Sequence, residues 1–109
     1  MKGRIKMFGL FSRKDINKGV VDWRSTPNAV LLDVRTPQEY NDRHIDGSLN
    51  IPLDSLNRIA DKISDKSTPL FVHCLSGARS AQAVSYLRKI GYSDVHDIGG
   101  INSYRGETV

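Results

Sequence analysis

The sequence has only one cysteine among its 109 residues, Cys74, and it has no long apolar run. A single cysteine excludes an intrachain disulfide and any metal site built from several thiolates. Because such sparse cysteine usage is typical of reducing compartments, we expect a cytoplasmic location. No stretch approaches the roughly 20 apolar residues that cross a membrane. With 39% hydrophobic and 26% charged residues, the composition is typical of one soluble globular domain.

Acidic residues are scarce near the N-terminus, where much of the basic charge of this chain of net charge +4 is found. Seven of the sixteen Lys and Arg residues lie within residues 1–24. We interpret residues 1–15 as a basic lead-in that packs some of its apolar side chains on the domain. A weak contact with a membrane surface or an anionic partner is the alternative. The apolar stretch of this lead-in is too short for a secretory signal. The basic residues form no recognised nucleic-acid-binding motif, so we expect no nucleic-acid partner.

Two continuous apolar runs, residues 29–32 and 70–72, predict buried strands, because they lack the alternation of a half-exposed strand. Shorter strands are expected around residues 48–51 and within residues 93–100. Residues 16–25 are expected to hold a short extended segment and a helix.

Helices are predicted between these strands. Thr36 and Glu39 form a capping box, which starts a short helix directly after the first apolar run. Apolar residues recur at helical spacing within residues 53–63 and again within residues 79–90. Gly91 is well placed to end the second of these helices. Strands that alternate with helices indicate an α/β fold with a mainly parallel sheet.

Cys74 directly follows a predicted strand, at the edge of the sheet where open α/β proteins bind their ligands. The residues between it and the next helix are mostly small, so backbone N–H groups can point into the loop. Two or three such donors, together with the helix dipole, would stabilise an anion. The pattern therefore favours a partly accessible thiolate nucleophile over an inert buried cysteine. The candidate substrate-binding residues are Leu75, Ser76, Gly77, Ala78 and Arg79.

Three segments in this order resemble the single-domain rhodaneses, a family of sulfurtransferases. They read "LLDVRTPQEY", "HIDGSLNIPL" and "FVHCLSGARSAQAVSYLRKIGYSDVHDIGGINSY". The resemblance implies a rhodanese-like domain over residues 16–109, with a largely parallel sheet of about five strands and helices on both of its faces. It also implies that Cys74 is the catalytic residue that opens the active-site loop. No metal and no cofactor are expected.

In such enzymes, sulfane sulfur passes from a donor such as thiosulfate to the cysteine, and the resulting persulfide gives it to cyanide or a thiol. The resemblance therefore implies a sulfurtransferase of the thiosulfate:cyanide type. Many thiosulfate-using members carry a basic residue after the cysteine, where this chain has Leu75. Because fewer cations should weaken attraction for a dianion, the donor can also be a protein persulfide or a small persulfide.

Two alternatives remain. The related phosphatases and arsenate reductases have five residues between the cysteine and the arginine, whereas four separate Cys74 from Arg79. The shorter loop suits a sulfur atom better than a phosphate. A rhodanese-like module that only binds a partner or docks sulfur is the other alternative. Whether Arg79 lines the pocket or anchors the start of the helix is left open by the sequence. Ser80 is expected to serve the first turn of that helix.

Other polar residues near these motifs are expected to be structural. Asp33, Arg35, His44 and Asp46 lie in the first two motifs, but their spacing does not suggest a metal site. We expect them to form hydrogen bonds that tie the first strand and its following loop to the domain. His73 should point away from Cys74, because neighbouring residues of a strand face opposite sides of the sheet.

Overall fold

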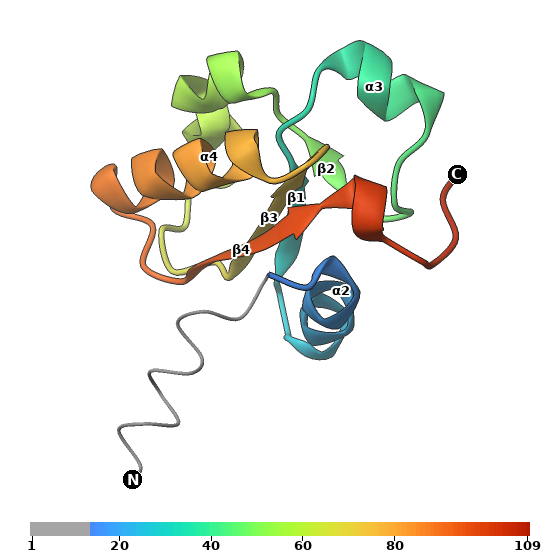
Figure 1. Ribbon diagram of the computed structural model, residues 1–109. Coiled ribbons are helices and arrows are strands. Elements are labelled where there is room, and N and C mark those ends of the chain that lie inside the picture. The colour runs from blue at the N-terminus through green and yellow to red at the C-terminus, as the bar shows by residue number, and fades with distance from the viewer. Residues whose placement is uncertain (1–13) are drawn as a thin grey trace, which may run out of the picture.

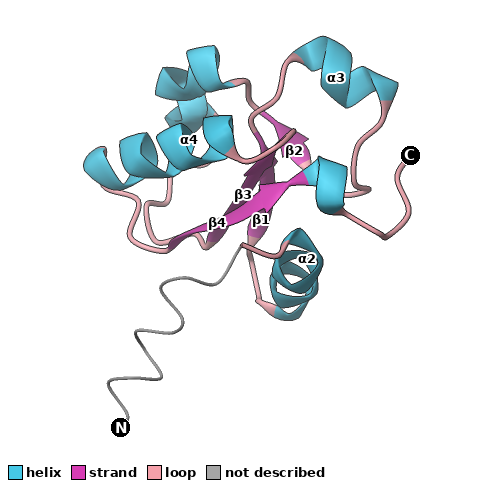
Figure 2. Ribbon diagram, in the orientation of Figure 1, coloured by secondary structure: helices cyan, strands magenta, loops and turns pink. Residues whose placement is uncertain are grey.

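The computed structural model describes residues 14–109, which form a parallel sheet with helices on both faces (Figures 1 and 2). Its elements are α2 (Ile16–Ser25), β1 (Val30–Asp33), α3 (Pro37–Asp42), β2 (Leu49–Asn50), η1 (Leu53–Asp61), β3 (Leu70–Cys74), α4 (Ala78–Lys89), β4 (Val95–Gly100) and η2 (Ile101–Ser103). The short elements η1 and η2 are 3-10 helices. The predicted α/β class is confirmed. Within the described residues the sheet has four strands, in the order β2-β1-β3-β4, rather than about five.

Strands β1 and β3 form the centre of the sheet because their side chains are apolar on both faces. All five residues of β3 are buried, and Leu31 and Leu32 of β1 have no exposed surface. The two strands pair in parallel, with Leu32 opposite Val72 and Asp33 opposite His73. The two continuous apolar runs therefore correctly predicted β1 and β3, the strands that are covered by helices on both faces of the sheet.

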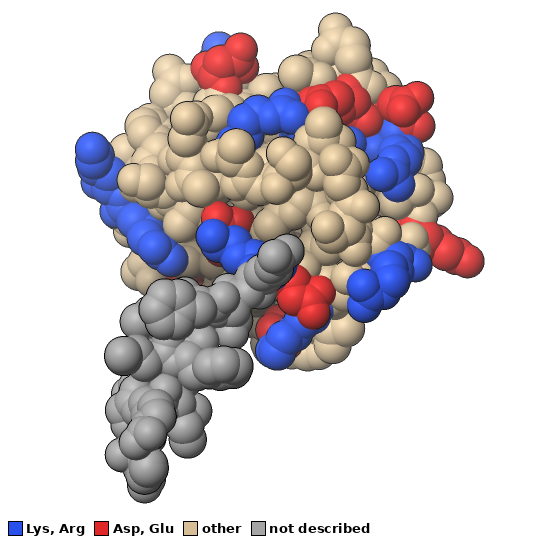
Figure 3. Space-filling model, in the orientation of Figure 1, with Lys and Arg blue, Asp and Glu red and all other residues tan. Residues whose placement is uncertain are grey.

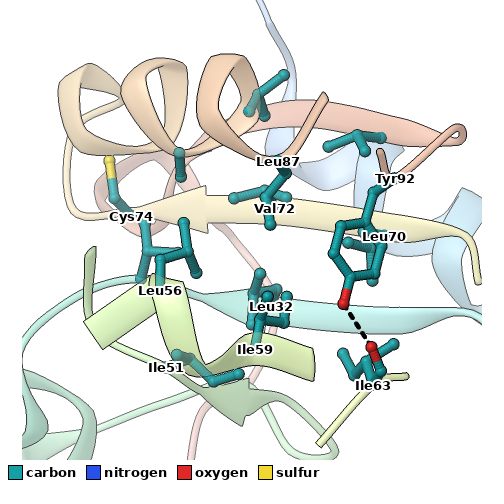
Figure 4. Close-up of a cluster of buried hydrophobic side chains, with 14 residues drawn as sticks. Leu32, Ile51, Leu56, Ile59, Ile63, Leu70, Val72, Cys74, Leu87 and Tyr92 are labelled. Carbon is teal, nitrogen blue, oxygen red and sulfur yellow. Dashed lines mark hydrogen bonds between the residues drawn. The ribbon is translucent and has the colours of Figure 1, made fainter. Parts of the chain in front are cut away.

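One face of the sheet carries η1 and α4. Figure 4 shows their apolar side chains meeting those of β1 and β3, together with Tyr92, whose hydroxyl donates to the carbonyl of Ile63. Cys74 belongs to this cluster. The periodic spacing within residues 53–63 correctly indicated the buried stripe of Leu56, Ile59 and Ile63, although the segment is mostly 3-10 helix.

The other face of the sheet carries α2. The prediction of a short extended segment within residues 16–25 is wrong, because this helix begins at Ile16. No extended segment precedes this helix within residues 16–25, because the Asp15 side chain accepts a hydrogen bond from the Asn17 N–H at 3.0 Å and caps the helix at Ile16. Ile16 and Val20, one turn apart, pack in the second apolar cluster, whereas Val21 is 62% exposed. Of the predicted basic lead-in, residues 1–13 lie outside the described part of the chain.

Both predicted helix signals are present. Thr36 accepts from the Glu39 N–H at 3.2 Å and Glu39 accepts from the Thr36 N–H at 2.8 Å, which is the complete capping box of α3. At the far end of α4, Gly91 adopts the left-handed φ of 109° that a glycine tolerates best, and its N–H donates to the carbonyl of Arg88. The capping box matters for the site, because it fixes Glu39.

Candidate functional site

Cys74 is the last residue of β3, and only three residues separate it from the first residue of α4. The last of these, Gly77, is the N-cap of α4 and has a φ of 113°, a left-handed conformation that glycine adopts without strain. This turn points the start of a twelve-residue helix back toward the thiol. Figure 4 shows the sulfur on the face of the sheet that α4 covers.

The Gly77 N–H donates a hydrogen bond to Cys74 Sγ at 3.0 Å. Within the described residues this is the one hydrogen bond to the sulfur, whereas the small loop residues suggested two or three aligned donors. The donor belongs to the N-terminus of α4, so the bond and the positive end of the helix act on the sulfur together. Both favour negative charge on Sγ.

The thiol is more enclosed than the sequence suggested. Cys74 is only 1% exposed, not partly accessible, because it packs among the apolar side chains beneath α4 and η1. Its neighbours in the loop differ: Ser76 and Ala78 are exposed, and Leu75 and Gly77 are half-buried. The loop therefore forms a thin cover over the sulfur.

Leu75 turns away from the sulfur. Its side chain packs against the second apolar cluster, on the α2 face of the sheet. Its carbonyl accepts from the Asn102 N–H at 3.0 Å, which ties the loop to η2. Next to this contact, a Cβ on Gly100 would lie 2.4 Å from the Leu75 carbonyl oxygen and 2.6 Å from the Ser76 Cα. Glycine at this position lets the loop lie directly on the end of β4.

A hollow of about 440 Å³ opens beside the loop, between Ser76 and Gly77 on one side and Gly99 and Gly100 on the other. Lys14 also lines it. Of the predicted substrate-binding residues, this hollow brings together Ser76 and Gly77. It does not include Leu75, Ala78 or Arg79.

Arg79 anchors the start of α4 to α3. Its guanidinium makes two parallel bonds to the Glu39 carboxylate, Nη1 to Oε1 at 2.8 Å and Nη2 to Oε2 at 3.0 Å. The paired guanidinium lowers the pKa of Glu39 to about 2, and the carboxylate raises the pKa of Arg79. Sequence reasoning identified Glu39 only as a helix cap, because a contact between residues forty positions apart leaves no local signal.

Ser80 and Asp97 form a second support that the sequence did not reveal in full. The buried Ser80 hydroxyl lies 3.0 Å from the Gly77 carbonyl and 2.9 Å from Asp97 Oδ1. Asp97 Oδ1 also accepts from the Gly99 N–H at 3.1 Å, and Lys14 Nζ lies 3.4 Å from Oδ2. Ser80 was expected to serve the first turn of the helix, and it also ties that turn to β4.

The polar residues of the first motif form a buried layer on the opposite side of the sheet from the thiol. Asp33 accepts from Arg35 Nε at 3.0 Å and from Nη2 at 2.8 Å, and both side chains are at most 2% exposed. Arg35 Nη2 also donates to the Arg43 carbonyl. His73 Nε2 lies 3.7 Å from Asp33 Oδ2 and, among the described residues, has no hydrogen-bond partner. Burial lowers the pKa of His73.

In the second motif, His44 makes structural contacts, whereas Asp46 is exposed and its side chain makes no hydrogen bond among the described residues. His44 stacks on Tyr40 with ring centroids 3.9 Å apart, and its Nδ1 lies 2.8 Å from the Tyr40 carbonyl oxygen. Its backbone pairs in both directions with Val109. Between residues 14 and 109, no three His, Cys, Asp or Glu side chains are placed to hold a metal ion.

Charged side chains of both signs are interspersed on the face shown in Figure 3. None of the helices that the structure describes is both long and apolar enough to cross a membrane.

A model of the rhodanese-like domain family matches residues 16–107. Among curated proteins, thiosulfate sulfurtransferase PspE of Escherichia coli K12 is 39% identical over 71 residues, which cover 64% of this chain and 68% of that protein. Thiosulfate sulfurtransferase GlpE of Tolumonas auensis is 35% identical over 80 residues, covering 72% of this chain and 74% of that protein.

Solved structures agree with these matches. A rhodanese with anions from E. coli is 35% identical, with a TM-score of 0.69 over 74% of this chain and 96% of that one. The rhodanese-like domain of the Alr3790 protein from Anabaena is 31% identical, with a TM-score of 0.70 over 77% of this chain and 83% of that one. By the family match across residues 16–107, this chain belongs to the rhodanese-like domain family.

Proposed function

We propose that this protein is a rhodanese-type sulfurtransferase that carries sulfane sulfur on Cys74. The observation that carries the proposal is the position of Cys74 Sγ, at the end of β3 and 3.0 Å from the Gly77 N–H at the N-terminus of α4. Hydrogen bonding and the helix dipole both stabilise negative charge there. Relatives named thiosulfate sulfurtransferase, 35–39% identical, support the same reaction class.

In the first half-reaction, the Cys74 thiolate attacks the outer sulfur of thiosulfate. A sulfur–sulfur bond forms to Cys74 as the sulfur–sulfur bond of the donor breaks, and the bonding electron pair leaves with sulfite. The product is a Cys74 persulfide that carries its negative charge on the outer sulfur. The Gly77 N–H and the helix terminus that stabilise the thiolate then also stabilise this anion.

In the second half-reaction, an acceptor nucleophile attacks the outer sulfur and Cys74 leaves as thiolate. Cyanide gives thiocyanate, and a thiolate gives a new persulfide. Small-molecule donors and acceptors, and a protein that carries a persulfide, all fit this scheme. Because Cys74 is 1% exposed, we expect sulfur to enter and leave as the loop of residues 75–77 moves aside.

The geometry favours sulfur transfer over phosphatase or arsenate reductase chemistry. Those reactions need an arginine that binds the oxyanion above the cysteine. Arg79 instead makes both of its parallel hydrogen bonds to Glu39, on α3. Cys74 is 1% exposed, and one added sulfur atom needs less room beside Sγ than a tetrahedral oxyanion does.

A turnover assay tests the proposal. The wild-type protein and Cys74→Ser are each given thiosulfate or a low-molecular-weight persulfide as donor, cyanide or a thiol as acceptor, and in parallel a phosphate ester. We expect wild-type turnover with at least one donor and none with Cys74→Ser. Phosphatase turnover that depends on Cys74 would refute the sulfurtransferase assignment. The complete absence of turnover would instead support a rhodanese-like module that only binds a partner.

A further inference from the structure

Glu39 and Arg79 form an ion pair at the start of α4, next to the candidate site. Their two parallel hydrogen bonds, at 2.8 and 3.0 Å, are the geometry in which a guanidinium and a carboxylate bind most strongly. The side chains are 28% and 32% exposed, so water only partly screens the pair. Arg79 therefore has little freedom to turn toward another anion.

The Glu39 carboxylate is itself held in place. Its Oε1 also accepts the Thr36 N–H at 2.8 Å, because Glu39 completes the capping box of α3. The pair thus joins the first turns of two helices, α3 and α4, both of which follow central strands of the sheet. A rigid carboxylate fixes the guanidinium more firmly than a mobile surface side chain would.

A hollow of about 260 Å³ lies next to the pair, and Arg79 is the one cation among the described residues that line it. The other lining residues are Val34, Thr36, Pro52, Leu53 and Asp54. Glu39 cancels the charge of Arg79, and Asp54 adds a negative charge. Among the described residues, the lining of this hollow and Glu39 together carry no net positive charge, and Leu75 contributes none beside the cysteine.

We propose that Glu39 is a specificity-determining residue for the sulfur donor: by holding Arg79, it disfavours dianionic donors such as thiosulfate relative to donors of lower charge. This inference rests on the proposed sulfurtransferase function. Glu39 acts through Arg79 and is a positioning residue, not a group that touches the reacting sulfur. Donors with one charge or none, such as a persulfide, are those that this arrangement favours.

The test compares two donors that differ by one charge. Thiosulfate is a dianion that releases sulfite, and methanethiosulfonate is a monoanion that gives the same persulfide and releases methanesulfinate. Glu39→Gln keeps a residue that can complete the capping box and frees Arg79. We expect it to raise the ratio of kcat/KM for thiosulfate to that for methanethiosulfonate about two- to fivefold, mainly through KM, and less at high salt.

A second readout does not depend on sulfur transfer. Iodoacetate and iodoacetamide alkylate the same Cys74 sulfur, but the first is an anion and the second is neutral. The ratio of their rates, iodoacetate to iodoacetamide, should also rise about two- to fivefold in Glu39→Gln. Because both reagents need the same opening of the loop, a general loosening of the structure would leave this ratio unchanged.

Two controls separate the role of the pair from net charge. Asp61→Asn also breaks an ion pair and removes one negative charge, but on the exposed side of η1. It should leave both ratios unchanged. The double variant Glu39→Gln/Arg79→Gln removes the freed cation, so both ratios should return to about the wild-type values or below.

The outcomes are distinct. If the ratio of the iodoacetate rate to the iodoacetamide rate is unchanged in Glu39→Gln, Glu39 does not have the proposed role. The same conclusion follows if the ratio rises and stays raised in the double variant. Both conclusions hold whether or not the protein transfers sulfur. A raised alkylation ratio without transfer from either donor supports the electrostatic role and refutes the sulfurtransferase function.

Discussion

Gly100→Ala tests how closely the active-site loop must lie on β4. Gly100 has an ordinary extended backbone, with φ of −120°, so only crowding opposes a side chain there. The new Cβ would lie 2.4 Å from the Leu75 carbonyl oxygen and 2.6 Å from the Ser76 Cα. Both neighbours are backbone atoms, so relief requires the loop itself to shift by about 1 Å.

We expect a net destabilisation of about 1–2 kcal/mol, since overpacking costs about 1–3 kcal/mol and the loss of glycine flexibility in the unfolded chain returns about 0.4–1 kcal/mol. For a domain of this size the Tm should fall by about 5–10 °C. The shift of the loop should also weaken the hydrogen bond from the Gly77 N–H to Cys74 Sγ. It should therefore slow the transfer of sulfur from a donor to Cys74, which is called sulfur loading below. Thermal unfolding by circular dichroism, with loading measured below the Tm, checks both effects.

A matched variant separates crowding from backbone strain. A Cβ on residue 77 would have no atom of the described residues within 4 Å, so Gly77→Ala does not press on β4. The substitution instead forces alanine into a φ of 113°, which costs about 1–2 kcal/mol. If Gly100→Ala unfolds at the wild-type temperature and loads sulfur at the wild-type rate, the close contact does not position the loop and the reasoning fails.

Two further predictions concern the supports of α4. The pKa of Glu39 is lowered from 4.5 to about 2 by Arg79, so its contribution to stability is complete above about pH 4.5 and disappears as the pH falls toward 2. Urea unfolding of the wild type between pH 6 and pH 2 should therefore lose more stability than that of Glu39→Gln, and equal losses would contradict the pairing. Ser80→Ala removes the hydroxyl between Gly77 and Asp97 and should cost about 1–2 kcal/mol, measured as a lower urea midpoint at pH 7. A midpoint equal to that of the wild type would show that this contact does not support the helix.

Local signals in the sequence predicted much of the fold. The continuous apolar runs gave β1 and β3, and the capping box of Thr36 and Glu39 placed the start of α3. The extended segment expected within residues 16–25 is absent. The Asp15 cap and the packing of Ile16 and Val20 on the sheet start the helix at Ile16 and leave no room for that segment.

The site was predictable in position and less so in detail. The end of a buried run located Cys74, and the small residues after it indicated a loop whose backbone faces the sulfur. Contacts across the fold decided the rest. Leu75 packs on the far face of the sheet, and Arg79 reaches Glu39 on another helix. Neither contact has a local pattern, because each depends on how distant elements pack.

The most direct measurement of the central claim is the intact mass of the protein after incubation with a sulfane sulfur donor and removal of the excess donor. Wild-type protein should gain the mass of one sulfur atom, Cys74→Ser should gain none, and cyanide should remove the added sulfur. A wild-type protein that stays unmodified by thiosulfate, methanethiosulfonate and a low-molecular-weight persulfide, or an equal gain in Cys74→Ser, would contradict sulfur carriage by Cys74.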